Sequence, residues 1–296
     1  RGAAIVFSGP ALRTGASRLT AQAALAVGAG LVTLVGEYEA LQEHAAHVTA
    51  IMLREADEHL TVVDDRARAA AIGPGAGISE HTRETVLHLL KKGLPLVLDA
   101  DAITSFADNP AELFEQLHDQ IVLTPHEGEF VRLFPAIDLA DRLTAARLSA
   151  ELSSAVILLK GPQTVVAAPD GRLAVNRHAS PWLATAGSGD VLAGLICGVL
   201  AQGNTAFEAA CIASWLHGDI GVRGGPGVTA GAMGGVVPLV LAGCLGGGGG
   251  RSGLSGQGGE VGRGLPGQVH REFPLACGRR SRRFLSLPFP SPPFRG

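Results

Sequence analysis

Short apolar segments alternate with amphipathic segments over residues 1–160, and this alternation constrains the fold more than any other feature of the chain. The apolar segments lie at 3–7, 31–35, 69–72, 94–98, 121–123 and 155–159. Helical patterns lie between most of them, at 19–27, 37–47, 80–91, 111–118 and 138–152. Continuous apolar strands separated by helices predict βαβ units, in which helices cover both faces of a parallel sheet.

The pattern changes after Lys160. Residues 164–168 and 172–175 read as two strands joined by Pro169-Asp170-Gly171, and Asp-Gly is a strong signal for a tight hairpin. Two helical segments follow, at 191–201 and 206–218. We therefore predict an α/β fold of three layers, in which helices flank a mostly parallel central sheet with an antiparallel hairpin at one edge.

Composition and charge limit the classes of function. The 296 residues are 46% hydrophobic but only 4% aromatic, so the core must consist of Ala, Val, Leu and Ile. Residues 243–296 hold eight Arg and two acidic residues, a net charge of +6, which leaves −9 of the total of −3 on residues 1–242. An acidic body argues against nucleic-acid binding. The longest apolar run, 191–201, is far shorter than the roughly 20 residues of a membrane-spanning helix, so no membrane partner is expected.

The last part of the chain differs from the rest. Residues 243–296 contain Gly246–Gly250, the run Arg279–Arg283 and a Pro-rich end, without apolar periodicity. Such a composition cannot offset the entropy cost of ordering, which predicts a disordered tail after one folded domain at 1–242. A solvated extension, as from a shifted reading frame, is favoured over an arm that binds RNA or an acidic partner. By resemblance to the family named below, the last helix of the domain is expected to end early, near Pro238.

The cysteines and the N-terminus indicate the compartment and the extent of the chain. No CxxC pair is present, and Cys197 and Cys211 lie in apolar helical patterns. Reduced core thiols in the cytoplasm are therefore favoured over a disulfide. The chain begins with Arg1 and has neither an initiator Met nor a signal peptide, so we expect its first residues to be missing.

The segment Gly187-Ser188-Gly189-Asp190 is the strongest functional signal, and it directly precedes the apolar helical run at 191–201. Small residues let consecutive backbone N–H groups turn toward one anion, and the positive end of the helix points to the same place. Asp190 falls in the first turn, where a carboxylate can accept the proton of a hydroxyl group. Ordinary capping of a helix N-terminus is the alternative to this phosphoryl-transfer site.

Four further motifs directly follow predicted strands. Gly73–Gly77 permits close approach of the backbone to a ligand, and Asp99 with Asp101 suits Mg²⁺ or a ligand hydroxyl. His126 stands beside two acidic residues where a strand gives way to a helix, and Lys160 is one of only three lysines and suits a phosphate contact. A tight turn, loop capping or an exposed histidine explains each motif taken alone. Because parallel strands end at one edge of a sheet, the motifs together predict one site.

These residues together resemble the ADP/ATP-dependent NAD(P)H-hydrate dehydratase family, a branch of the ribokinase-like superfamily. The resembling segments follow the family's order over residues 1–240 and are 28–33, 73–77, 98–102, 124–129, 160–164 and 185–190. The resemblance implies a ribokinase-like fold and a metabolite-repair enzyme of the carbon–oxygen lyase class. Its substrate would be the S epimer of hydrated NADH or NADPH (NADHX or NADPHX). ADP or ATP would phosphorylate the ring hydroxyl, loss of phosphate would restore the double bond, and Mg²⁺ would accompany the nucleotide.

The same resemblance implies roles for particular residues. Asp190 would be the catalytic base, with Gly187, Ser188 and Gly189 as the anion hole. The nucleotide contacts would be Lys160, Gly161, Pro162, Gln163, Thr164 and Gly189. The contacts to the hydrated dinucleotide would be Ala29, Gly75, Gly77, His126 and Asp190. No metal ligand is implied, a cytoplasmic homotetramer is expected, and Glu127 stands where the family commonly has Pro.

Two other interpretations share the predicted anion site. A ribokinase-like kinase of a small alcohol or vitamin precursor would use the same base and anion hole but release a phosphorylated alcohol. A non-catalytic nucleotide-binding fold would keep the architecture without the reaction. The retained Asp190 and Lys160 argue against the second alternative, and the segments at 98–102 and 124–129 favour the dehydratase over the kinase.

Overall fold

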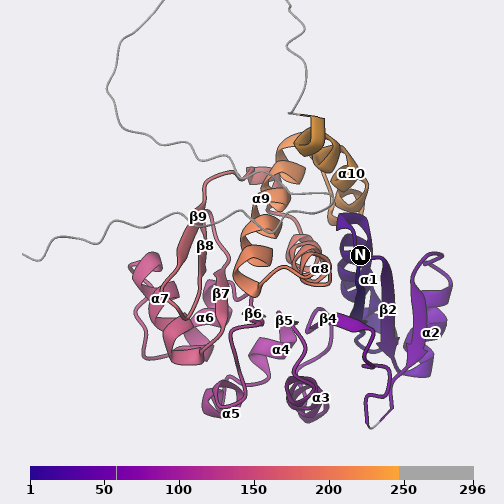
Figure 1. The fold of residues 1–296 in the computed structure, drawn as a ribbon, viewed down its shortest axis with the longest axis horizontal. Helices are drawn as coiled ribbons and strands as arrows, with labels where there is room; N and C mark the ends of the chain where they lie inside the picture. Colours follow the sequence, from indigo (N-terminus) through magenta and orange to yellow (C-terminus); the bar gives the residue numbers. More distant parts are fainter. Residues whose placement is uncertain (58, 247–296) are drawn as a thin grey trace, which may run out of the picture. The chain divides into compact units, whose positions relative to one another are not determined.

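A computed structural model describes residues 1–57 and 59–246, of which residues 1–241 form one compact unit. Within these residues a nine-stranded sheet has the order β3-β2-β1-β4-β5-β6-β7-β8-β9 (Figure 1). Neighbouring strands are parallel from β3 to β7, and β7-β8 and β8-β9 are antiparallel pairs. The strands are β1 (Ala3–Phe7), β2 (Leu31–Gly36), β3 (Met52–Glu55), β4 (Ala67–Ile72), β5 (Leu96–Leu98), β6 (Ile121–Leu123), β7 (Val156–Leu159), β8 (Thr164–Ala167) and β9 (Leu173–Asn176). The predicted fold class is confirmed.

Helices cover both faces of the sheet (Figure 1). On one face α1 packs along α8, α8 contacts α9, and α9 continues over β6 to β9. The opposite face carries α3, α5 and α7, whose apolar side chains join one buried cluster with the strands. The helices are α1 (Thr14–Val27), α2 (Tyr38–Ala45), α3 (Glu80–Lys91), α4 (Asp101–Thr104), α5 (Pro110–Phe114), α6 (Glu127–Leu133), α7 (Arg142–Ser153), α8 (Ser188–Leu200), α9 (Ala206–Gly224) and α10 (Ala230–Gly246), with 3-10 turns η1 (Ala11–Arg13) and η2 (Pro181–Leu183).

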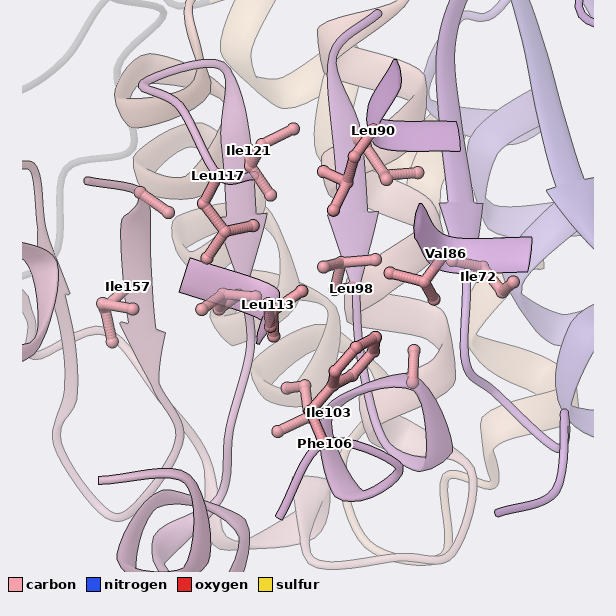
Figure 2. Close-up of a cluster of buried hydrophobic side chains, with 14 of the residues drawn as sticks. Ile72, Val86, Leu90, Leu98, Ile103, Phe106, Leu113, Leu117, Ile121 and Ile157 are labelled. Carbon is pink, nitrogen blue, oxygen red and sulfur yellow. The ribbon is translucent and has the colours of Figure 1, made fainter. Parts of the chain in front are cut away.

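The core on this second face follows from the alternation of side chains along each strand. Leu98 of β5 and Ile121 of β6 are fully buried, and they lie beneath Val86 of α3 and Leu113 of α5 (Figure 2). Phe106, from the loop after α4, is fully buried in the same cluster. Aliphatic side chains supply most of this core, as the low aromatic content predicts.

One strand escaped prediction. Met52–Glu55 forms β3, which pairs only with β2 at the edge of the sheet, and three of its four side chains are exposed. An edge strand exposed to water does not need apolar residues, so it carries no periodic signal. The helices at 101–104 and 127–133 also lie outside the predicted helical ranges, because each is too short for a hydrophobic period to show.

Two helices begin directly after a residue whose side chain caps the first turn. Ser79 caps α3 by accepting the N–H of Thr82, and Thr205 forms a capping box with Glu208 at the start of α9. The expected end of α9 at Gly218 is wrong, because this helix continues to Gly224. A Cβ at Gly218 would collide with the carbonyl oxygen of His178, so this glycine serves close packing and not termination.

The expected end of the last helix near Pro238 is also wrong. Proline lacks an N–H and its ring crowds the carbonyl four residues earlier, which disfavours a helix interior. Here Pro238 is exposed, its partner four residues back is a glycine, and α10 continues to Gly246. The first residues of the predicted tail, 243–246, are therefore helical, and residues 247–296 lie outside the described part of the chain.

Glycines allow α1 and α8 to approach closely. A Cβ at Gly194 would lie 2.8 Å from the Cβ of Ala23, and one at Gly198 would lie 2.9 Å from the Cα of Ala24. The four-residue spacing of this glycine pair places both glycines on the face of α8 that packs against α1. No helix of the described residues is long and apolar enough to span a membrane.

Candidate active site

The carboxyl ends of β4, β5, β6 and β7 bring four loops to one edge of the sheet. The N–H of Gly77, after β4, donates to Oδ2 of Asp101, after β5, at 2.8 Å. The hydroxyl of Thr124, after β6, donates to Oδ1 of Asp99 at 2.7 Å. Motifs separated by tens of residues along the chain are therefore in direct contact. They lie beside the point where the strand order reverses, between β1 and β4, which is where open α/β sheets bind ligands.

Lys160 connects these loops electrostatically. Its Nζ lies 2.7 Å from Oδ1 of the buried Asp99 and 3.7 Å from Oε2 of the buried Glu129. Burial lowers the pKa of Lys160, but the two carboxylates outweigh this effect and raise it above its usual value. The ammonium group of Lys160 therefore stays charged beside these buried carboxylates.

The N-terminus of α8 presents open backbone amides. No side chain caps this helix, and within the described residues the N–H groups of Gly189 and Asp190 have no acceptor. The N–H of Ser188 donates instead to the carbonyl of Thr185, at 3.2 Å. A Cβ at Gly189 would lie 3.6 Å from Nζ of Lys160, so the ammonium group faces the same turn. Open amides, the helix dipole and a fixed cation together favour a bound anion.

Gly187 is required by this turn. Its φ of +85° lies in the left-handed region, which side chains with a Cβ rarely adopt. A Cβ there would also lie 2.7 Å from Cδ1 of Leu19 and 2.9 Å from the Cβ of Ala230. Glycine at this position allows α8 to begin against α1 and α10 with its amides exposed.

Asp190 is half-buried in the first turn of α8. The pKa of its carboxyl group is raised to about 6, mainly by burial and also by the nearby Asp99 and Asp101, while Lys160 opposes the rise. Thr20 of α1 holds the same turn by donating its hydroxyl to the carbonyl of Asp190 at 3.0 Å. A carboxylate whose pKa lies near neutrality is suited to accept a proton from a hydroxyl group.

His126 and Glu129 form a reciprocal cap at the start of α6. Nδ1 of His126 accepts the N–H of Glu129 at 3.2 Å, and Oε2 of Glu129 accepts the N–H of His126 at 2.8 Å. Because Nδ1 is an acceptor, the neutral ring carries its proton on Nε2. Nε2 of His126 lies 3.4 Å from Oε1 of Glu129, and more than half of the His126 side chain is exposed, so a ligand can approach the ring from solvent.

The structure does not bring Ala29 to this edge. Ala29 is 1% exposed and precedes β2, so it lies at the amino end of the parallel strands, and the neighbouring Gly30 donates to the carbonyl of Gly2. Ala29 therefore lies apart from the other predicted site residues within this chain, and its contact with the dinucleotide stays a prediction. Gly75 does lie at the site edge, where a Cβ would be 3.3 Å from the Cβ of Ala16 at the start of α1.

Sequence reasoning missed several partners in the site. His217 of α9 lies 2.9 Å from Oγ of Ser188 through its Nε2, and burial lowers its pKa to about 4, so the ring is neutral. The guanidinium group of Arg13 would lie 3.7 Å from a Cβ at Gly77. Arg142 contacts the loop that begins at Lys160. None of these residues belongs to a local motif, and only their tertiary neighbours identify them.

The described residues contain no group of three or more His, Cys, Asp or Glu side chains arranged to hold a metal ion. Asp99, the most suitable carboxylate, is occupied by Lys160 and Thr124. His44 is buried against Ser8 and is equally unsuited. Cys197 and Cys211 form no disulfide, and burial raises the pKa of both thiols to about 12, as expected for unreactive core cysteines.

The sheet order, the antiparallel edge and the open N-terminus of α8 define a ribokinase-like protein. The structure resembles Arabidopsis thaliana ribokinase with a TM-score of 0.54 at 12% identity, over 81% of this chain and 98% of that one, which shows the fold alone. A family model described as NAD(P)H-hydrate dehydratase matches residues 4–232. The chain belongs to this family.

Individual relatives agree with the family. A bifunctional NAD(P)H-hydrate repair enzyme of Gloeobacter violaceus is 41% identical over 74% of this chain and 44% of its own length. An ADP-dependent (S)-NAD(P)H-hydrate dehydratase of Neisseria meningitidis serogroup B is 35% identical over 80% of this chain and 82% of its own. The structure of the Bacillus subtilis ADP/ATP-dependent NAD(P)H-hydrate dehydratase, co-crystallized with ATP/Mg²⁺, has a TM-score of 0.72 at 27% identity, over 81% and 89% of the two chains. The chain spans less than half the length of the bifunctional relatives.

Proposed function

We propose that this chain is a nucleotide-dependent (S)-NAD(P)H-hydrate dehydratase, a carbon–oxygen lyase of metabolite repair. It would convert the S epimer of NADHX or NADPHX back to NADH or NADPH, with ADP or ATP as phosphoryl donor. Family membership supports this substrate class. The single observation that carries the proposal is Asp190, a half-buried carboxylate whose pKa is about 6, in the first turn of a helix with open amides.

The first step is phosphoryl transfer to the ring hydroxyl. Asp190 takes the hydroxyl proton, and the oxygen attacks the terminal phosphorus while the bond to the rest of the nucleotide breaks. The amides of Gly189 and Asp190, together with Lys160, stabilise the negative charge of the transferring group. ATP would leave as ADP, or ADP as AMP.

The second step is elimination. The ring carbon–oxygen bond breaks, inorganic phosphate departs, and a proton leaves the adjacent ring carbon to form the double bond. The charges that held the transferring phosphoryl group hold the departing phosphate, so one anion site serves both steps. Neither the product nor the nucleotide retains the phosphoryl group, which distinguishes this enzyme from a kinase.

The remaining site residues divide into two groups in this proposal. Lys160–Thr164 and Gly189 contact the nucleotide, and Gly75, Gly77, His126 and Asp190 contact the hydrated dinucleotide. The exposed ring of His126 would contact the substrate while Glu129 holds its Nε2. Ser188 supports the anion hole through its bonds to Thr185 and His217, and not through a free amide.

Side chains in the described part of the chain form no metal site of their own, so we propose that Mg²⁺ arrives with the nucleotide, held by phosphate oxygens and water. The ion would neutralise charge on the phosphates. The family resemblance also leads us to propose a cytoplasmic homotetramer, which cell fractionation and light scattering test directly.

The decisive experiment follows absorbance at 340 nm after the protein is added to purified S-NADHX with Mg²⁺, in parallel with ADP, with ATP and without nucleotide. A nucleotide-dependent rise with stoichiometric release of phosphate is expected. Nucleotide consumption without a rise, when a small alcohol is supplied, would indicate a kinase. Nucleotide binding without either reaction would indicate a non-catalytic fold.

A further inference from the structure

Arg142 lies beside the loop between β7 and β8, and its surroundings are unusual for a surface arginine. It is the first residue of α7, placed there by Asp141, which caps the helix by accepting the N–H groups of Leu143 and Thr144. A positive charge at a helix N-terminus opposes the helix dipole. Arg142 therefore weakens its own helix, and its position calls for another explanation.

The guanidinium group contacts three carbonyl groups of this loop. Nη2 of Arg142 donates to the carbonyl of Lys160 at 3.0 Å, and it lies 3.3 Å from that of Leu159 and 3.4 Å from that of Gln163. Only about a fifth of the side chain is exposed. The pairing of Leu159 with Val165 joins the two ends of the loop, and within the described residues the carbonyls of Lys160 and Gln163 accept no hydrogen bond other than those of Arg142.

Gly161 and Glu127 complete this arrangement. A Cβ at Gly161 would lie 2.9 Å from Cζ of Arg142, so the guanidinium group occupies the space that a side chain at 161 would need. The other nitrogen, Nη1, pairs with the carboxylate of Glu127, which is more than half exposed. The guanidinium group of Arg142 thus binds Glu127 of α6 through Nη1 and the carbonyl groups of the loop through Nη2.

We propose that Arg142 is a positioning residue for nucleotide binding: it holds the Lys160–Thr164 loop in the conformation that receives the nucleotide. This inference rests on the proposed function, in which that loop contacts the nucleotide. Arg142 itself touches no reacting atom. Its effect is on the loop backbone, while the turn of His126 is held by its own cap with Glu129.

The test measures the dissociation constants of ADP and ATP, each with Mg²⁺, by calorimetry on the full chain. Arg142→Gln should weaken nucleotide binding at least about tenfold and raise the KM for nucleotide, while the KM for S-NADHX stays within about twofold. Arg147→Gln is the matched control, because Arg147 is exposed on the same helix and hydrogen-bonds no loop atom. The dissociation constants of the Arg147→Gln variant for ADP and ATP should remain within about twofold of those of the unmodified chain. Glu127→Gln should weaken nucleotide binding by less than about threefold, since exposed ion pairs contribute little to stability.

A double-mutant cycle separates positioning from general destabilisation. Gly161→Ala should weaken nucleotide binding like Arg142→Gln, because the new methyl group displaces the guanidinium group. When Gly161→Ala is combined with Arg142→Gln, nucleotide binding should weaken little beyond the loss caused by Arg142→Gln alone, since the guanidinium group no longer fills the space beside residue 161. Arg142→Lys keeps the positive charge but has fewer hydrogen-bond donors, so its loss of nucleotide affinity should be intermediate. This variant replaces Arg142→Gln in the test if the glutamine variant folds poorly.

The outcomes distinguish the two proposals. If the unmodified chain binds nucleotide and Lys160→Ala weakens binding, but Arg142→Gln does not, the role of Arg142 is refuted and the proposed function stands. Multiplicative losses in the Gly161 cycle would also refute it. If the unmodified chain binds neither ADP nor ATP, the proposed function fails and this inference fails with it.

Discussion

At the scale of single residues, the carboxylates of Asp99 and Asp190 differ in their burial and in their partners. Asp99 and Lys160 pair at 2.7 Å, whereas Asp190 is half-buried and, among residues 1–57 and 59–246, hydrogen-bonds to no cation. Burial, followed by the charge of Asp99, raises the pKa of Asp190, while the carboxylates around Lys160 keep its ammonium group charged. One carboxylate is thereby reserved to hold a cation, and the other is free to exchange a proton.

Asp190→Asn tests the proposed base. Asn keeps the size of the side chain and cannot accept the proton, so turnover of S-NADHX should fall by about 10² to 10⁴-fold. Nucleotide affinity and the unfolding midpoint should change little, because the amides and Lys160 remain. Turnover is measured at 340 nm and affinity by calorimetry, and a near-normal rate would remove Asp190 from the mechanism.

The pH dependence of the rate tests the same residue independently. A base acts only when deprotonated, so with a pKa of about 6 the rate should be constant above neutrality and fall below pH 6, to about a tenth of the plateau at pH 5. Values of kcat/KM for S-NADHX from pH 5 to 8 give the profile, because kcat/KM reports the pKa of the free enzyme. A plateau that continues unchanged to pH 5 would show that Asp190 does not titrate in the rate-determining step.

At the scale of elements, the contact of α1 with α8 positions the anion site. Gly194 lets α8 lie against the backbone of α1 at Thr20, and the hydroxyl of Thr20 in turn bonds the carbonyl of Asp190. The body of α1 is therefore in direct contact with the first turn of α8. Packing of two helices, far from any ligand contact, sets where the base lies.

Gly194→Ala should destabilise the fold. Its methyl group would meet the carbonyl of Thr20 and lie 2.8 Å from the Cβ of Ala23, and such overpacking costs about 1–3 kcal/mol, more than the helix propensity that alanine adds. Denaturant unfolding measures the free energy. Gly235→Ala in α10 is the control, because nothing lies within 4 Å of its Cβ position, and it should be neutral or stabilising. Equal effects of both variants would contradict the packing argument.

At the scale of the whole molecule, we propose that residues 1–242 are the functional domain and that residues 243–296 do not contribute to its core. The compact unit of residues 1–241 already contains every strand of the described chain and all the proposed site residues. The change of composition after residue 242 supports the same division. The chemistry is therefore assigned to the first four-fifths of the chain.

Truncation after Gly246 tests this division. The shortened chain keeps α10 complete, so its unfolding midpoint should stay within about 2 °C of that of the full chain and its rate with S-NADHX within about twofold. Differential scanning calorimetry and the 340 nm assay measure the two quantities. A drop of several degrees would show that the removed segment packs on the domain.

The sequence by itself determined the fold class and the positions of the loops at the site. Apolar strands, helical periods, caps such as Ser79 and the Asp170-Gly171 turn are local signals, and each acts within a few residues. Only the tertiary structure decided which residues meet. Asp99 and Lys160 are 61 residues apart, and Ala29 lies at the opposite edge although its motif resembles the family's. Such contacts depend on strand order and helix packing, which no local pattern encodes, and this is why Arg142 and His217 could be found only in the folded chain.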